Sequence, residues 1–99
     1  MNILIHEEAE SDLFEGYIFY ESQESGLGDY FLDSLFSDID SLQLYAGIHP
    51  VKSGYYRLLS QRFPYAVYYK MEEQCVNVWA VLDCRQNPGG IEKHLSERS

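Results

Sequence analysis

The chain has 99 residues, enough for one domain with a single core but not for two. Hydrophobic residues make up 45% of it and aromatic residues 15%, which excludes a disordered chain. Its longest apolar runs are about five residues, as in Val78–Leu82, far below the roughly 20 that a membrane span requires. The first ten residues, MNILIHEEAE, show no basic stretch and no small-residue cleavage site. We therefore expect no signal peptide and a cytoplasmic location.

The net charge of −9 is distributed unevenly along the chain. Residues 1–50 contain eleven Asp or Glu and no Lys or Arg, whereas residues 51–99 contain all seven basic residues and five acids. The two halves thus carry charges of −11 and +2. An acidic surface of this kind aids solubility, and it cannot grip nucleic acid. We expect no direct DNA binding by this chain.

The cysteines and histidines indicate neither a disulfide nor a metal site. Cys75 and Cys84 fall on one predicted strand, where nine residues span roughly 30 Å, so we expect two free thiols. There is no CxxC motif, and His6, His49 and His94 are scattered without ligand spacing. We predict no metal and no cofactor.

The first half of the chain predicts a strand followed by a helical hairpin. Residues 2–5 are typical of a short strand, and apolar residues then recur at helical spacing over about 7–24 and about 29–45. The glycines within 25–28 separate the two helices, and Gly47 and Pro50 end the second. The two apolar stripes consist of Ala9, Leu13, Tyr17 and Tyr20, and of Phe31, Leu35, Ile39 and Leu42.

After Pro50 the apolar spacing changes to that of strands. Residues 55–60, 65–71 and 75–83 are rich in Tyr, Val and Trp, and connections of three or four residues predict an antiparallel meander. On the last strand, alternation places Val76, Val78, Ala80 and Leu82 on the face packed against the helices, and Cys75, Asn77, Trp79, Val81 and Asp83 on the other. Ile91 and Leu95, four residues apart, suggest a short last helix.

The element order β-α-α-β-β-β-(α) predicts an α+β fold, a single domain over residues 1–99. The helical hairpin is expected on one face of a small, mainly antiparallel sheet, with the other face partly open.

The open face is where a candidate site is expected. If the exposed sides of the strands coincide, Arg57, Asp83 and Arg85 converge beside Trp79, with Arg62 at one hairpin end and Lys70 on the middle strand. Such a cationic patch with aromatic walls suits a phosphate or a partner's carboxylates. The alternative interpretation is that Arg57 pairs with Asp83 and that the other charges are an ordinary sheet surface.

Three segments together resemble the RelE/ParE superfamily of toxins from bacterial type II toxin–antitoxin modules. They are EGYIFYESQESGLGDYFLDSL, YYRLLSQRFPYAVYYK and VNVWAVLDCRQNP, and the resemblance runs from about Ala9 to Ile91. It implies the same β-α-α-β-β-β fold. It also implies neutralisation by a small antitoxin whose C-terminal segment wraps the toxin and covers the sheet and its basic residues.

The resemblance implies one of two activities. RelE-like members cut mRNA in the ribosomal A site by attack of the ribose 2′-OH on the adjacent phosphate, whereas ParE-like members inhibit DNA gyrase. By motif position Arg57 and Arg85 are the family-matched arginines. If the chain is a nuclease, these two would be its catalytic residues and would bind the phosphate. Asp83 would then serve as a base or orient an arginine. Where such nucleases often carry a His or Tyr, this chain has Asp83 and Cys84 before Arg85.

Charge favours the ParE-like interpretation, because docking into ribosomal RNA requires several Lys or Arg contacts. We therefore expect a plasmid-stabilisation-like toxin that contacts a protein target, gyrase, and is neutralised by an antitoxin. The binding residues are expected to be Arg57, Arg62, Lys70, Trp79 and Arg85. Two alternatives stay open: a ribosome-dependent mRNA endonuclease, which would make the chain an enzyme, and a degenerate, non-toxic module that only binds the antitoxin.

Overall fold

The computed structural model of the chain describes residues 1–98. In chain order its elements are β1 (Asn2–Ile5), α1 (Glu7–Gln23), α2 (Leu27–Asp40), α3 (Leu42–Tyr45), β2 (Val51–Lys52), β3 (Tyr55–Leu59), β4 (Tyr65–Glu72), β5 (Cys75–Asp83) and α4 (Pro88–Ser96). None of the described helices is long and apolar enough to cross a membrane.

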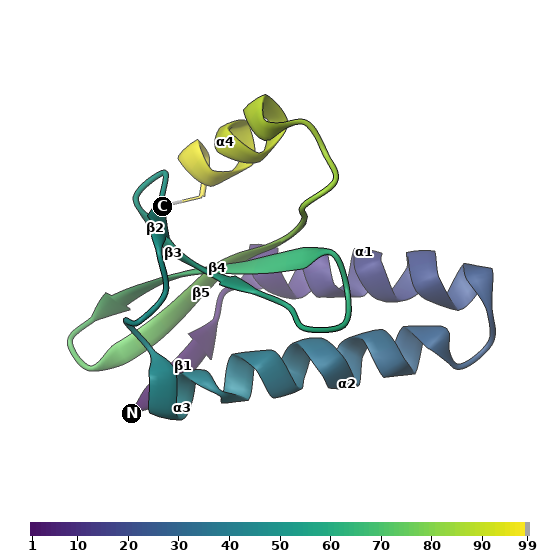
Figure 1. Cartoon of the computed structure of the whole chain (residues 1–99), viewed down its shortest axis with the longest axis horizontal. Coiled ribbons are helices and arrows are strands. Elements are labelled where there is room, and N and C mark those ends of the chain that lie inside the picture. Colours follow the sequence, from purple (N-terminus) through teal and green to yellow (C-terminus); the bar gives the residue numbers. More distant parts are fainter. Residues whose placement is uncertain (99) are drawn as a thin grey trace.

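The strands form one five-stranded sheet in the order β1-β5-β4-β3-β2. β1 runs parallel to β5, and the other neighbours are antiparallel. The predicted α+β class and the helical hairpin on one face of the sheet are confirmed (Figure 1). Two details differ: the second helix is interrupted at Ser41, and the two-residue edge strand β2 was not predicted.

Two glycines allow the hairpin helices to pack closely. A Cβ on Gly16 of α1 would lie 2.4 Å from the Phe31 ring, and one on Gly28 of α2 would lie 2.7 Å from the Tyr17 ring. Either side chain would therefore clash across the helix pair. Glu21 fixes the connection, since its carboxylate accepts hydrogen bonds from the N–H groups of Gly26 and Gly28. This is a helix N-terminus stabilised by a negative charge.

A bulge in β5 changes which of its residues face the helices. Tyr68 of β4 pairs with Ala80 and Tyr69 pairs with Val78, so Trp79 is an extra residue on β5. An extra residue shifts side-chain alternation by one position. The predicted face was therefore wrong beyond Trp79: Val76, Val78 and Val81 pack with the hairpin, whereas Ala80 and Leu82 lie on the opposite face with Trp79.

The second face of the sheet is covered in part by α4, which lies across the sheet from the hairpin (Figure 1). Leu95 of α4 is buried there with Tyr55, Tyr68, Ala80 and Leu82, and Ile91 packs against the same cluster. The face is thus only partly open, as expected, because the nine-residue α4 carries Ile91 and Leu95 on one side and buries this apolar stripe against the sheet.

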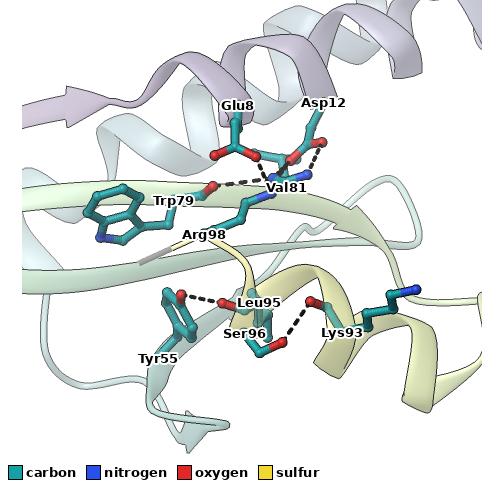
Figure 2. A network of polar contacts seen from close by, with 9 residues as sticks. All are labelled: Glu8, Asp12, Tyr55, Trp79, Val81, Lys93, Leu95, Ser96 and Arg98. Carbon is teal, nitrogen blue, oxygen red and sulfur yellow. Dashed lines mark hydrogen bonds and ion pairs between the residues drawn. The ribbon is translucent and has the colours of Figure 1, made fainter.

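Polar contacts hold the end of α4 against the body of the protein (Figure 2). The guanidinium of Arg98 donates hydrogen bonds to both carboxylate oxygens of Asp12 in α1 and to the carbonyl oxygen of Trp79. It also forms an ion pair with Glu8, 3.4 Å away. Tyr55 donates a hydrogen bond to the carbonyl oxygen of Leu95 at 2.7 Å. The Asp12–Arg98 pair is buried, and it links the two helical layers.

Candidate functional site

The basic residues expected to converge lie on different faces of the protein. Arg57 lines a hollow with Tyr68, Cys84 and Ile91, which belong to the face covered by α4. Arg85 instead reaches Tyr20 of the hairpin, with its Nη2 3.5 Å from the Tyr20 hydroxyl. The physical reason is the β5 bulge, which places Asp83 on the hairpin side of the sheet, where Arg85 pairs with it. The predicted convergence of Arg57, Asp83 and Arg85 is therefore wrong.

Arg85 is neutralised by Asp83. Its Nε and Nη2 donate to the two carboxylate oxygens of Asp83 at 3.0 and 2.8 Å, and its backbone N–H donates to the same carboxylate. These hydrogen bonds from Arg85 lower the pKa of Asp83, and the pair raises the pKa of Arg85. Burial and the nearby Asp83 charge together raise the pKa of Tyr65 to about 12. Asp83 therefore orients an arginine, one of the two roles expected for it.

Arg62 lies at the hairpin, away from Arg57, whereas Trp79 lies on the sheet face of Arg57 but outside its hollows. The Arg62 guanidinium lies 6.0 Å from the centre of the Tyr30 ring, at the tip of the helical hairpin. Trp79 stacks on His6 with ring centres 3.7 Å apart. Arg62 is exposed and Trp79 is half-buried, and neither residue lines a hollow with Arg57.

Lys70 shares the sheet face of Arg57. Its ammonium group lies 4.6 Å from the centre of the Tyr55 ring, and Tyr55 is two residues from Arg57 on β3. Residues two apart on a strand point to the same side. Of the expected binding residues, the structure thus places Arg57, Lys70 and Trp79 on one face.

Arg57 lies between two hollows, which we call the Arg57 site. The smaller, of about 90 Å³, is lined by Lys52, Ser53, Arg57, Tyr68, Cys84, Pro88, Ile91 and Glu92. The larger, of about 430 Å³, is lined by His49, Pro50, Val51, Lys52, Arg57, Leu58 and Leu59. Two cations, Lys52 and Arg57, are common to both, and Glu92 brings one acid.

The guanidinium of Arg57 is incompletely bonded. Its Nε–H is buried and donates to no other group among residues 1–98. A buried donor without a partner costs about 1–3 kcal/mol, and more when it is charged. An anion that accepts a hydrogen bond from this Nε–H would recover that cost, and Lys52 adds a second positive charge. The Arg57 site is therefore suited to a carboxylate or phosphate.

Tyr68 and Cys84 at the site are unsuited to act as bases, whereas His49 is suited. Burial raises the pKa values of Tyr68 and Cys84 although Arg57 lowers both, so both stay protonated at neutral pH. His49 is the exception, because burial lowers its pKa and keeps the ring neutral. Its Nδ1 lies within hydrogen-bond distance of the Tyr69 hydroxyl.

Sequence reasoning missed Lys52 and His49. Both precede the meander in a segment without strand periodicity, so no alternation pattern indicated which side they would face. Their only sequence signal was the following Gly54, whose positive φ of 85° is typical of a tight turn. That turn folds β2 back onto β3 and carries Lys52 to Arg57.

Among residues 1–98, no group of three or more His, Cys, Asp or Glu side chains is arranged to hold a metal ion. Cys75 and Cys84 are both free thiols.

Of three comparisons with known proteins, the one with solved structures identifies the fold. No protein-family model matches the sequence, and no curated protein sequence matches it. The fold does match a chain of the solved structure of the chromosomal ParDE TA system from P. aeruginosa, with a TM-score of 0.75 and 16% sequence identity. The match covers 82% of this chain and 92% of that one. The chain therefore has the ParE-like fold that its resemblance to the RelE/ParE superfamily implied.

Proposed function

We propose that this chain is the toxin of a type II toxin–antitoxin module, that it acts by contact with a protein target, DNA gyrase, and that a cognate antitoxin neutralises it. The observation that carries the proposal is the match of fold to a chain of the ParDE system over most of both chains. The proposal implies a cytoplasmic location, because gyrase acts on chromosomal DNA.

The charges support a protein target over RNA. The whole chain carries −9, and the Arg57 site offers two cations beside the acid Glu92. Gripping ribosomal RNA requires several phosphate contacts, each made by a Lys or Arg. Asp83, moreover, is held by Arg85 and does not lie beside Arg57 to act as a base.

For neutralisation, we propose that an antitoxin segment with acidic and apolar side chains occupies the Arg57 site. A carboxylate would accept the hydrogen bond from the buried Arg57 Nε–H, and apolar side chains would cover Leu58 and Leu59 in the larger hollow. Arg62 and Arg85 lie elsewhere and take no part in this contact.

One observation favours a second candidate function, a ribosome-dependent mRNA endonuclease. His49 is neutral and lines the same hollow as Arg57, which is the pairing of base and cation that attack by a ribose hydroxyl requires. In this alternative His49 takes the proton and Arg57 holds the phosphate.

Expression in bacteria tests the module first. Growth should stop when the chain is expressed alone and resume when a small neighbouring reading frame is co-expressed. Normal growth without that partner would favour the non-toxic binding module.

Two assays with purified protein then separate the targets. The proposal expects inhibition of gyrase supercoiling and no cleavage of mRNA on translating ribosomes. Cleavage that is lost in His49→Ala but kept in His94→Ala would establish the endonuclease instead, and supercoiling unaffected by excess protein would count against the gyrase target.

A further inference from the structure

One edge of β5 has no neighbouring strand where β1 ends. β1 pairs with β5 only as far as Val78, so residues 79–83 have no strand beside them on that edge. The side chains of Asp12 and Arg98 take the place of a strand there, because both form hydrogen bonds with backbone groups of β5 (Figure 2). A hollow of about 340 Å³ lies along the same edge, and we call it the β5-edge hollow.

The β5-edge hollow lies between α1 and α4. Val81, which packs with the hairpin, and Leu82, which lies on the opposite face, both line it, so it is at the edge of the sheet. α1 contributes Glu15 and Phe19, which are four residues apart and therefore on one side of the helix, and α4 contributes His94. Small-molecule sites in proteins have volumes of about 300–1,000 Å³, so the hollow has room for a small ligand.

Tyr65 brings an unused hydroxyl group to the β5-edge hollow. The residue is only 9% exposed, and its ring packs against Phe31 with ring centres 4.9 Å apart. Its hydroxyl forms no hydrogen bond with another group among residues 1–98. It is not one of the fully buried unpaired atoms, so the hollow that Tyr65 lines gives access to it. Because tyrosine hydroxyls in buried positions usually have a partner, this one indicates a ligand that supplies it.

Glu15 brings a carboxylate that no cation neutralises. It takes part in none of the ion pairs among residues 1–98, since the nearby Arg85 and Arg98 pair with other acids. Its charge adds to the effects of burial and of Asp83 in raising the pKa of Tyr65. Four acids and two arginines, a net charge of −2, lie in or beside the hollow: Glu8, Asp12, Glu15, Asp83, Arg85 and Arg98. The β5-edge hollow therefore attracts a cation and repels an anion.

From these observations we propose that the β5-edge hollow binds a guanidinium group carried on an alkyl chain. The Glu15 carboxylate and the Tyr65 hydroxyl oxygen accept hydrogen bonds from its nitrogens, and the 47% exposed ring of Phe19 offers an aromatic surface for stacking. An ammonium group suits the hollow less well, because it is more strongly hydrated and has no plane to stack on a ring. The hollow shares no lining residue with the Arg57 site, so the two sites are independent.

NMR titration of the full chain with two small molecules of the same shape tests the proposal. n-Butylguanidinium carries the proposed group, and n-butylurea is its uncharged counterpart. n-Butylguanidinium should give saturable shifts of the backbone amides of Glu15, Phe19 and Asp83, and n-butylurea should bind at least tenfold more weakly. Equal binding of the two compounds, or shifts that do not saturate, would overturn the proposal.

A third compound distinguishes the two sources of such a group, a free small molecule and an arginine side chain of another protein. N-acetylarginine methylamide presents the guanidinium as a peptide does. Affinity equal to or higher than that of n-butylguanidinium would assign the hollow to a protein arginine, and affinity at least tenfold lower would assign it to a free molecule. Absence of binding by both compounds would contradict the proposal.

Two variants localise the binding. Glu15→Gln should weaken binding of n-butylguanidinium at least fivefold, whereas Glu10→Gln, the same change on the same helix outside the hollow, should alter it less than twofold. Tyr65→Phe keeps the ring in the core and removes only the hydroxyl, so it should weaken binding at least threefold. Its thermal unfolding midpoint should stay that of the wild type, because the hydroxyl has no partner to lose among residues 1–98.

Two results with these variants would contradict the assignment. Equal weakening by Glu15→Gln and Glu10→Gln would mean that the cation is attracted to the acidic surface in general. Unchanged affinity in Tyr65→Phe would mean that the hydroxyl does not contact the ligand. Neither result bears on the Arg57 site or on toxicity.

Discussion

Arg57 and Arg85 carry the same charge on the same meander, but their surroundings are opposite. Arg57 has a buried Nε–H without a partner in the described chain and faces two hollows. Arg85 is exposed at the surface, and its guanidinium already forms two hydrogen bonds with Asp83. The difference indicates that an arginine's availability for binding depends on its unused donors more than on its exposure.

Arg98 is the arginine with which Arg57 and Arg85 can both be compared, because its guanidinium is buried and its hydrogen bonds and ion pairs lie within the chain. Replacing Arg98 with Ala leaves the Asp12 carboxylate buried, with the Val81 N–H as its only remaining donor among residues 1–98. Removing one partner of a buried pair costs about 3–5 kcal/mol, so we expect the free energy of unfolding to fall by about that much. Urea denaturation measures it, with Lys93→Ala on exposed α4 surface as the control. A loss below about 1 kcal/mol would mean that the pair behaves like a surface contact.

The second prediction compares Arg57→Ala with Arg85→Ala in binding to the proposed antitoxin. Loss of a buried, charge-assisted contact costs about 2–5 kcal/mol, so Arg57→Ala should weaken binding about thirtyfold or more. Arg85→Ala should weaken it by less than about fivefold, because its charge is already paired and exposed. Isothermal titration calorimetry measures both. An equal loss of antitoxin affinity in the two variants would contradict the proposed difference between Arg57 and Arg85.

The third prediction concerns Glu92, the acid that lines the smaller hollow. The Glu92→Gln variant removes a negative charge that repels an incoming carboxylate. We expect antitoxin binding to tighten about two- to fivefold, as suits one exposed charge, and the gain to shrink with added salt. Weaker binding in this variant would show that Glu92 itself contacts a basic group of the partner.

The smallest effect is expected for the Asp83–Arg85 pair and depends on pH. The pKa of Asp83 is lower in the folded protein than its ordinary value of 3.8, so the pair stabilises the fold above that value. The contribution disappears as pH falls through the lowered pKa. Wild type should thus have a slightly higher Tm than Arg85→Gln at pH 6, and the two should converge at strongly acidic pH, measured by thermal unfolding. A difference that persists in strong acid would assign Arg85 another partner.

Much of the fold could be predicted from the sequence because apolar residues recur at the spacing of a helix or of a strand in most of its elements. The bounds of β1 and β5 were predicted to the residue, and α1 differs by one residue at its end. The two-residue β2 could not be predicted because it is too short to show alternation.

The candidate site was predicted less well, and the reason is the bulge in β5. The segment Val78–Leu82 is apolar at every position, so no polar residue indicates where the alternation shifts. Strict alternation placed Asp83 on the wrong face, and the expected convergence with Arg57 depended on that placement. Arg57 itself was identified correctly as a residue on the face opposite the hairpin.

The claim central to this account is that a partner's carboxylate binds Arg57 and leaves Arg85 unaffected. Heteronuclear NMR of the arginine Nε–H groups, recorded with and without the antitoxin, tests it directly. The account predicts that the Arg57 signal shifts and becomes protected from solvent exchange while the Arg85 signal keeps its position. An unchanged Arg57 signal in a saturated complex, with a shift at Arg85 instead, would contradict it.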